Sequence, residues 1–551
     1  MTSTDPTDRT PTTTRASRRL SLATCPEVSQ RPGVTGPAVD PTAVTVGIVH
    51  LGIGAFHRAH QAVFTEDAAA ATGQTGWGIL GVTQRSATVV EQLVPQDGLY
   101  GVRTVGTDSS SLRVIGSVRS VAFPREETQR VLDAIAAPTT HVVTLTVTEK
   151  GYTAGPDGRL DLSDGDVRGD IDALVGEIRG AAALARQTGT EVQGAATAHV
   201  VVEDAVPARS AIGLLVRGLA ARSRAGGEPL TVLTCDNLLD NGHVLEGLVG
   251  QALDAAAGVP GADPEQVERL RAWVHASVTF PCTMVDRIVP ATTEDDRAAA
   301  EAATGVRDEG LVVAEPFMQW VIEDRFAGPR PAWELAGATL TADVAPFERA
   351  KLRMLNGTHS LLAYLGSIAG HRLIADAVAD PALLSAARSL LLDDVIPTLV
   401  APEGLDLAAY AESLLERFAN PALGHTTTQV AMDGSKKLPI RFLATAADRL
   451  AAGAVPDAVA HGVAGWVVFV AAGRTVTGEP LRLDDPIADG LRSAAAEVAA
   501  PDEVAPAHAE ALVRRLLAVE QVFPAEIRDH AGFRDAVVTH TGRLLAGYAQ
   551  H

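Results

Sequence analysis

The two halves of the chain differ in how their apolar positions are spaced. In the first half, β-branched apolar runs end in glycine or polar residues at 45–54, 77–82, 141–152 and 230–242. These runs predict buried strands, and the first passes through a glycine turn into an alanine-rich amphipathic pattern that predicts a helix. After about residue 340 the strand signals fade and helical periodicity continues to the end. We therefore expect an α/β domain over 41–340 and a mainly α-helical domain over 341–551.

Several other segments have weaker patterns. We expect strand and loop at 278–292, a short amphipathic piece at 315–326 and a loop at 432–439. The apolar run at 462–473 is about half the ~20 residues that a membrane span needs, so it predicts a buried helix. Residues 1–40 predict a disordered extension because they are rich in Thr, Ser, Pro and Arg, and 187–206 predicts a surface insertion. The sequence assigns no role to either of the last two segments.

The glycine turn after the first strand is a candidate dinucleotide site. Gly52 and Gly54 lie between strand and helix, where free backbone amides and the helix dipole can hold a pyrophosphate. The third glycine of a G-x-G-x-x-G fingerprint is replaced by His57. His57 and His60 also have an HxxH spacing that could suit a metal, but no third ligand lies nearby and packing at the helix start is the favoured interpretation.

Polar residues follow two other predicted strands, and the carboxyl ends of parallel strands share one edge of a sheet. The residues expected in that crevice are Thr148, Glu149, Lys150, Asp236 and Asn237. The acid that usually binds a ribose 2′-hydroxyl is missing after the strand at 77–82, and Arg85 stands there instead. The residues alone therefore leave both NAD and NADP open.

A second candidate site lies on one predicted helix, 346–366. Pro346 suits its first turn, where a missing N–H costs nothing. At about 100° per residue, Lys351, Asn356 and His359 fall on one wall of this otherwise apolar helix. The helix dipole and an apolar cleft would lower the pKa of Lys351, which makes it a candidate general base. The alternative is that Lys351 reaches solvent, Asn356 bonds a turn and His359 packs in the core.

Composition narrows the classes of function. The formal net charge of -21 argues against nucleic acid or an anionic membrane surface as a partner. Cys25, Cys235 and Cys282 are dispersed and form no CxxC pair, so neither a disulfide framework nor a zinc site is expected, and a reducing cytoplasm fits. The absence of GxSxG, Walker A and HExxH motifs leaves hydrolase and phosphotransferase activities without support.

Eight collinear stretches together resemble the polyol-specific long-chain dehydrogenase (mannitol dehydrogenase) family. They are HLGIGAFHRAHQA, QDGLYGV, LTVTEKGY, CDNLLDNGH, FPCTMVDRIVPAT, EPFMQWVIED, KLRMLNGTHSLLAYLG and MDGSKKLP, and they span about 45 to 440. FPCTMVDRIVPAT and KLRMLNGTHS resemble the fructuronate reductase branch more than they resemble mannitol 2-dehydrogenase. The resemblance implies a Rossmann-type N-terminal domain, a mainly α-helical C-terminal domain, an active site in the cleft between them and no metal.

The resemblance also implies roles for individual residues. Its K-x4-N-x2-H signature falls on Lys351, Asn356 and His359, and Asn237 matches a second amide that polarises the substrate carbonyl. Asp286 and Lys437 match positions that line the substrate pocket. Lys436 and Arg287 lie in the same motifs as further candidate cations. The cofactor-binding residues expected at the strand ends are Gly52, Gly54, Ala55, Phe56, Arg85, Thr146, Thr148 and Glu149.

The expected activity is metal-independent hydride transfer between a nicotinamide cofactor and C2 of a sugar acid or polyol. The resemblance implies NAD, with NADP as the alternative. We expect D-fructuronate and D-mannonate as substrates, because cations near the pocket could hold a carboxylate. The alternatives are mannitol 2-dehydrogenase, a related polyol or polyol-phosphate dehydrogenase, a zinc-dependent polyol dehydrogenase and a non-catalytic sugar-acid sensor. We expect a small-molecule partner and a monomer or weak oligomer.

Overall fold

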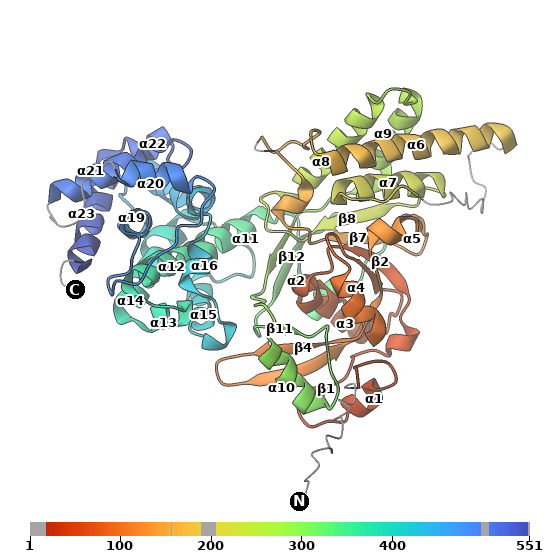
Figure 1. Ribbon diagram of the computed structural model, residues 1–551, viewed down its shortest axis with the longest axis horizontal. Coiled ribbons are helices and arrows are strands. Elements are labelled where there is room, and N and C mark those ends of the chain that lie inside the picture. Colours follow the sequence, from red (N-terminus) through yellow and green to blue (C-terminus); the bar gives the residue numbers. More distant parts are fainter. Residues whose placement is uncertain (1–17, 156, 189–204, 497–505, 549–551) are drawn as a thin grey trace, which may run out of the picture.

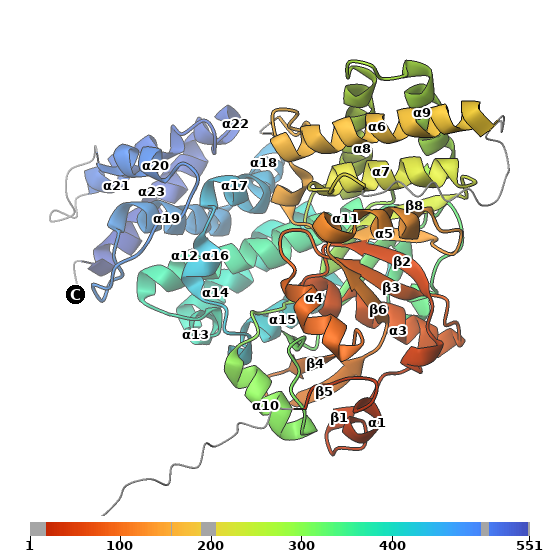
Figure 2. The same ribbon diagram turned by 45° about the vertical axis from the view of Figure 1, so that its right-hand side comes forward.

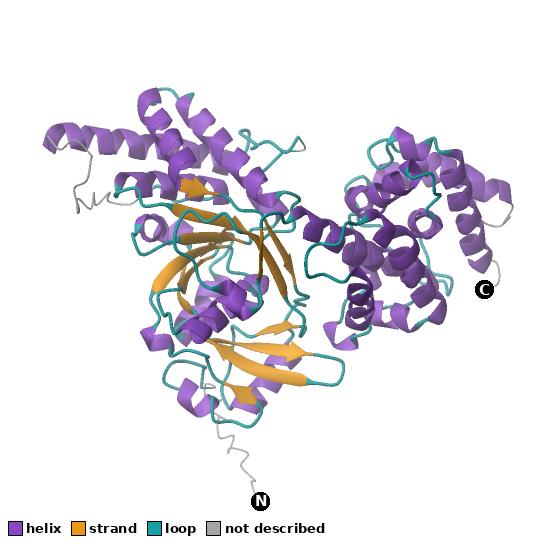
Figure 3. Ribbon diagram, turned by 180° about the vertical axis from the view of Figure 1, so that it is seen from behind, coloured by secondary structure: helices purple, strands orange, loops and turns teal. Residues whose placement is uncertain are grey.

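The computed structural model describes residues 18–155, 157–188, 205–496 and 506–548. Within these ranges, all strands lie in one lobe and the other lobe is built from helices (Figure 3). Most of the predicted insertion at 187–206 falls outside the described residues. The α/β N-terminal domain and the mainly helical C-terminal domain expected from the sequence are both present.

The N-terminal lobe is organised around a six-stranded parallel sheet in the order β6-β3-β2-β7-β8-β9. Its strands are β2 (Val46–Leu51), β3 (Gly78–Val82), β6 (Val118–Ala122), β7 (Val142–Leu145), β8 (Leu230–Thr234) and β9 (Val278–Thr279). Numbered along the chain, this is the 3-2-1-4-5-6 order of the Rossmann fold. The predicted strands at 77–82, 141–152 and 230–242 are confirmed as β3, β7 and β8.

Helices cover both faces of this sheet (Figure 1). They are α2 (Ala55–Ala59), α3 (Gln61–Thr72), α4 (Thr88–Leu93), α5 (Pro124–Ala136), α6 (Gly165–Thr188), α7 (Ala211–Arg224), α8 (Asn241–Ala257) and α9 (Pro264–Ser277). Neighbouring residues of β2 point to opposite faces of the sheet and pack in two different hydrophobic cores. Ile48 belongs to the core that contains Trp320, and Val49 belongs to the core formed with α5, α7 and α8. A strand buried on both faces is uniformly apolar, which explains the β-branched runs in the sequence.

Two smaller sheets complete this lobe. One has the order β1-β5-β4-β11 and the other β10-β12-β13. Their strands are β1 (Val34–Thr35), β4 (Tyr100–Val105), β5 (Ser110–Ile115), β10 (Thr283–Asp286), β11 (Val312–Ala314), β12 (Gln319–Glu323) and β13 (Thr339–Thr341). The segment 315–326, expected to be a short amphipathic piece, therefore contains strand β12, whose Trp320, Val321 and Ile322 are buried.

The prediction of a disordered extension over 1–40 is wrong for residues 18–40. These residues include α1 (Cys25–Val28) and strand β1, in which Val34 pairs with Leu112 of β5. Leu20, Val28 and Val34 are buried in a small core that also holds Ala300 of α10 (Glu294–Thr304). A few well-placed apolar side chains thus outweigh a composition that is otherwise typical of disorder. Residues 1–17 lie outside the described part of the chain.

The C-terminal lobe surrounds α19 (Asp457–Ala472), which confirms the buried helix predicted at 462–473. Its other helices are α11 (Ala345–Ala350), α12 (Gly357–Ala369), α13 (Ile374–Ala379), α14 (Pro381–Ser389), α15 (Leu407–Phe418), α16 (Thr427–Ala431), α17 (Gly434–Leu438), α18 (Ala444–Ala451), α20 (Ala488–Ala496), α21 (Pro506–Leu517), α22 (Ala525–Arg528) and α23 (Ala531–Tyr548). The loop expected at 432–439 is mostly helix α17. Among the described residues, no helix combines the length and apolarity needed to cross a membrane.

The predicted helix 346–366 exists but is not regular. It begins at Ala345, whose amide donates to the Asp343 carboxylate at 2.9 Å. A π-helical turn, Lys351–Asn356, separates α11 from α12, and the three pieces run from the lobe boundary into the helical lobe (Figure 2). Each residue of a π turn advances by less than 100°, so the turn changes the angular positions that a regular helix predicts. Such turns occur frequently at functional sites.

Candidate active site

The glycine turn after β2 has a geometry that is compatible with a dinucleotide site. Gly52 has φ +99°, and a Cβ there would lie 2.1 Å from the carbonyl oxygen of Thr146. Thr146 also donates from Oγ1 to the Gly52 carbonyl at 2.8 Å, so the turn is held against the end of β7. Gly54 is exposed, and a Cβ there would meet nothing closer than the Gly52 oxygen at 3.8 Å. The turn therefore presents its backbone to open space, which suits a bound pyrophosphate.

The two histidines of the HxxH motif pack inside the protein. The His57 ring stacks on His50 with 3.3 Å between centroids, and His60 Nε2 bonds the Gln319 carbonyl at 2.8 Å. Burial lowers the pKa of His60 to about 3. The packing interpretation is confirmed, and the buried His57 ring occupies the place of the missing third glycine.

The polar residues that follow β7 and β8 lie at one edge of the sheet, as predicted. The amides of Val147 and Thr148 both donate to the Asp236 carboxylate at 2.9 Å, and Tyr152 donates to it at 2.8 Å. Asp236 therefore orders the loop rather than facing a ligand. Thr148, Glu149 and Asn237 remain exposed at this edge, and so does Arg85 at the end of β3. Ala55 and Phe56 of α2 are half-buried beside the glycine turn.

Lys351 lies where the two lobes meet. Its ammonium nitrogen donates to the Asn237 side-chain oxygen and to the Val285 carbonyl, the latter at 2.7 Å. Burial lowers the pKa of Lys351 and outweighs the opposite effect of the nearby Asp286 carboxylate. The sequence analysis attributed this lowering to the helix dipole and to a partly apolar cleft, and desolvation, the effect expected of such a cleft, is the largest cause. The structure thus brings the predicted general base into contact with the predicted amide Asn237 across the lobe boundary.

Glu348 is a site residue that the sequence analysis missed. It lies one turn before Lys351 on α11, and its carboxylate accepts from the Asp240 amide at 3.4 Å. Burial raises the pKa of Glu348 to about 7. The three-residue spacing between Glu348 and Lys351 could have indicated that the two side chains lie on one face of the helix. It was not informative, because an acid in the first turn of a helix is usually explained by the helix dipole.

Asn356 and His359 lie further along the same segment. The Asn356 carbonyl accepts from Arg441 at 3.3 Å, and its side chain is half-buried. His359 stacks on Phe418 and His425, with ring centroids 4.9 and 5.7 Å away, and it borders a small cavity. Its buried Nε2 has no partner among the described residues, and burial lowers its pKa. A neutral imidazole with a free ring nitrogen can bind a substrate hydroxyl.

Asp286 is occupied by an arginine that the sequence analysis did not consider. Arg417 of α15 bonds both Asp286 oxygens at 2.8 and 3.1 Å and both Glu315 oxygens at 3.0 and 2.8 Å. All three side chains are buried. Although burial alone would lower it, the pKa of Arg417 is raised by these two acids. The cluster joins the helical lobe to the N-terminal lobe beneath the site.

The candidate cations have different environments. Arg287 does not face the pocket, because its guanidinium donates to the carbonyls of Ala59 and Glu315, and Lys436 is exposed. Lys437 is half-buried and donates to the Val430 carbonyl at 3.2 Å. Burial, helped by the charge of Arg441, lowers the pKa of Lys437 to about 8.

Arg441 is the second cation near Lys437, and the sequence analysis missed it. It donates to Ser360 Oγ at 2.8 Å, and burial lowers its pKa to about 10. Among the described residues, no carboxylate forms an ion pair with Lys437 or Arg441. The four-residue spacing of these two residues would have been informative had 432–439 been predicted as helix.

A Rossmann sheet whose strand ends meet a buried lysine bonded to the amide of Asn237 is typical of one class of protein, a two-domain dehydrogenase. Two family models match almost the whole described chain, the mannitol dehydrogenase Rossmann domain over 46–335 and the mannitol dehydrogenase C-terminal domain over 343–545. The chain belongs to the mannitol dehydrogenase family. The comparisons confirm the predicted class, an NAD-dependent alcohol dehydrogenase.

Individual relatives cover nearly the full length. The chain is 38% identical to D-mannonate oxidoreductase of Escherichia coli (strain K12) over 92% of this chain and 94% of that protein. It is 32% identical to a mannitol dehydrogenase of Saccharomyces cerevisiae, covering 92% and 91%. Among solved structures, Pseudomonas fluorescens mannitol 2-dehydrogenase with NAD and D-mannitol matches with a TM-score of 0.75 at 30% identity, covering 97% of this chain and 98% of that chain.

Proposed function

We propose that this protein transfers hydride between NAD and C2 of a six-carbon sugar acid, interconverting D-fructuronate and D-mannonate. The nicotinamide accepts or supplies the hydride when NAD is bound at the turn that contains Gly52 and Gly54. The protein's own side chains bind the substrate, hold its oxygen and move its proton. The relationship to D-mannonate oxidoreductase supports this substrate.

Lys351 moves the proton. In the oxidative direction its neutral amine accepts the hydroxyl proton as hydride departs, and in the reductive direction the ammonium returns that proton. Burial favours the neutral amine and outweighs the opposite effect of the nearby Asp286 carboxylate, because among the described residues no acid lies at ion-pair distance from Lys351. Asn237 and Asn356 donate from their side-chain amides to the substrate oxygen as negative charge develops on it. His359 positions a neighbouring hydroxyl.

The single observation that carries the choice of a sugar acid is the pair Lys437 and Arg441. Both are half-buried on the helical wall of the site, and among the described residues neither has an ion-paired acid. An uncompensated pair of buried cations is costly, whereas a substrate carboxylate would neutralise it with charge-assisted hydrogen bonds. A ketose without an acid group, such as D-fructose, leaves this cost unrelieved.

A substrate panel read at the absorbance of reduced nicotinamide tests the proposal. With D-fructuronate, D-fructose and D-fructose 6-phosphate compared by kcat/KM, we expect the sugar acid to be preferred, and a chelator to leave the rate unchanged. Preference for fructose would assign a mannitol 2-dehydrogenase, and preference for the phosphate a polyol-phosphate dehydrogenase. Tight binding of the acid without any absorbance change would identify a sensor.

The same assay run with both cofactors tests the choice of NAD. A preference above about tenfold for NADP would show that the missing acid after β3 and the exposed Arg85 govern cofactor binding. We further propose that the protein is cytoplasmic. We also propose that it is a monomer or weak oligomer, and size-exclusion chromatography with light scattering would check this oligomeric state.

A further inference from the structure

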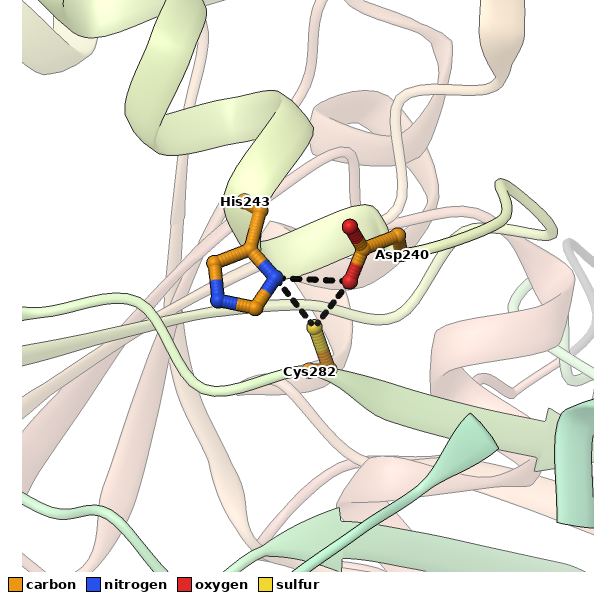
Figure 4. Close-up of side chains that lie close together, drawn as sticks. All are labelled: Asp240, His243 and Cys282. Atoms are coloured by element: carbon orange, nitrogen blue, oxygen red, sulfur yellow. Dashed lines mark hydrogen bonds and ion pairs between the residues drawn. The ribbon is translucent and has the colours of Figure 1, made fainter. Parts of the chain in front are cut away.

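Three side chains with different ligand atoms converge beside the active site (Figure 4). Asp240 precedes α8, His243 lies in its first turn, and Cys282 lies immediately before β10. His243 Nδ1 is 2.6 Å from Asp240 Oδ1, and Cys282 Sγ is 3.4 Å from that oxygen and 3.6 Å from that nitrogen. Among the described residues, this is the one group of three such side chains close enough to share a metal ion.

The backbone is built to hold these side chains together. Gly242 allows α8 to approach β10, because a Cβ there would lie 2.4 Å from the Phe280 carbonyl oxygen and 2.8 Å from the Cys282 nitrogen. Asn241 makes two bonds to the Thr283 backbone, at 2.8 and 2.9 Å. The two segments are therefore fixed to each other by the two residues that stand between Asp240 and His243.

The conformation of Asp240 also favours a ligand role. Asp240 has φ +54°, in the left-handed region, and its side chain makes no capping bond to α8 although it stands at the N-cap position. An aspartate at this position would ordinarily cap the helix. Here the carboxylate faces His243 and Cys282 instead, so the usual structural explanation for an N-cap aspartate does not apply.

The spacing fits a tetrahedral ion of the zinc type. Zinc binds nitrogen and oxygen at about 2.0–2.2 Å and sulfur at about 2.3 Å, which places tetrahedral ligand atoms about 3.3–3.6 Å apart. Both sulfur distances agree with this spacing. The Nδ1–Oδ1 distance must lengthen, and the Asp240 and His243 side chains, 66% and 54% exposed, are free to rotate. An imidazole, a thiolate and a carboxylate together suit zinc better than magnesium or calcium, which prefer oxygen ligands alone.

We propose that Asp240, His243 and Cys282 form a binding site for one zinc-type divalent ion, with a solvent molecule as the fourth ligand. The ion replaces the thiol proton of Cys282, which is released, and it takes the Nδ1 lone pair of His243, whose proton then resides on Nε2. This site is separate from hydride transfer. Sequence reasoning excluded it because the three cysteines are dispersed, but Cys282 meets ligands 39 and 42 positions away.

Both segments that carry the proposed metal ligands also contact Lys351 in the active site. The loop that ends at Asp240 carries Asn237, and β10 carries Val285; the side-chain oxygen of the first and the carbonyl of the second accept from Lys351. A bound ion therefore joins the same two segments that contact Lys351, but Asn241 already bonds these segments to each other, so hydride transfer does not require the ion.

Cobalt titration of the purified full-length protein tests the site without any need for turnover. With Co²⁺ as the sole added metal, we expect one ion per chain, a sulfur-to-cobalt charge-transfer band in the near ultraviolet and the visible bands of a tetrahedral site. Zn²⁺ should remove these bands by displacement. Because the readout is spectroscopic, it can fail while the proposed activity stands, and the activity can fail while the site stands.

Two matched pairs of variants locate the ion. Cys282→Ser should lose the charge-transfer band, whereas Cys25→Ser, which changes another buried cysteine, should keep it. His243→Gln should weaken Co²⁺ binding by at least about tenfold, whereas His275→Gln, at an exposed histidine on α9, should leave it unchanged. Absence of the band in the unmodified protein, or its persistence in Cys282→Ser, would overturn the proposal. Should Cys282→Ser fail to fold, unchanged affinity in His243→Gln would overturn it equally.

Discussion

Two groups of buried or half-buried cations on the helical lobe lie near the lobe boundary, and they differ in what neutralises them. Arg417 is held by Asp286 and Glu315, and this pairing raises its pKa. Lys351, Lys437 and Arg441 have no such partner among the described residues, and burial lowers the pKa of each. Under the proposed function, this difference separates a charge that stabilises the fold from charges that can bind a substrate. We call the first group the paired cluster and the second the unpaired wall.

The largest expected effect is on the unpaired wall itself. Lys351→Met should lower turnover by about 10²- to 10⁴-fold, because general acid–base assistance contributes on that scale. Its melting temperature should be unchanged, since the methionine fills the same space without burying a charge. Stopped-flow measurement of the hydride-transfer step is the check. Lys436→Met removes an exposed lysine from the same lobe and should keep full activity; full activity in Lys351→Met would exclude the assigned base.

A substitution in the paired cluster should lower the stability of the fold rather than act first on turnover. Arg417→Met leaves two buried carboxylates without a cation, and breaking a buried pair in this way costs about 3–5 kcal/mol. Urea unfolding measures the loss. Arg388→Met is the matched control, because Arg388 pairs with Glu412 on the surface and exposed pairs contribute about 0–1 kcal/mol. Equal losses in the two variants would show that Arg417 does not hold the lobes together.

Lys437 should make recognition of the sugar acid dependent on pH. Its folded pKa is about 8, so Lys437 is protonated below that value and loses its charge as pH rises through it. The ratio of kcat/KM for D-fructuronate to that for D-fructose should therefore fall above about pH 8, by less than tenfold because Arg441 stays charged. Using the ratio cancels the titration of Lys351. Lys437→Met should give a ratio that does not change over this range, and an unchanged ratio in the unmodified enzyme would contradict the assignment.

The smallest expected effect concerns stability at the unpaired wall. Arg441→Met removes a cation that has no ion-paired acid among the described residues. The variant loses the hydrogen bonds to Ser360 and Asn356, but it also avoids the cost of desolvating the guanidinium, and the two effects offset each other. We expect the free energy of unfolding to change by less than about 1 kcal/mol. A loss as large as that of Arg417→Met would place Arg441 in the structural group.

Some features of the fold and of the candidate site could be predicted from the sequence, and others could not. The parallel strands were predictable because a strand buried on both faces has a continuous apolar run, as in β2 and β7. Lys351, Asn237 and the glycine turn lie in compact motifs that the family resemblance covers. The remaining features depend on tertiary contacts. Arg417 reaches acids 102 and 131 positions away, so no local pattern reveals the pairing.

Other differences between the predicted and the observed elements have local physical causes. The π turn at Lys351–Asn356 adds a residue to one helical turn, and no propensity scale separates it from regular helix. The folded stretch at 18–40 contains only a few apolar residues, and it is ordered because they fit a core built by β5 and α10. Helix α17 begins with Gly434 and precedes Pro439, two residues that usually indicate a loop, yet Gly434 is required because a Cβ would lie 2.7 Å from Trp466 Nε1.

The central claim is that the unpaired wall recognises a carboxylate, and the most direct measurement is substrate preference in Arg441→Met. We predict that kcat/KM for D-fructuronate falls about 10- to 100-fold, the value of a charge-assisted bond, while kcat/KM for D-fructose is unchanged. Arg482→Met, at an exposed arginine of the same lobe, should leave both values unchanged. An equal loss for both substrates in Arg441→Met, or a preference of the unmodified enzyme for D-fructose, would contradict the account.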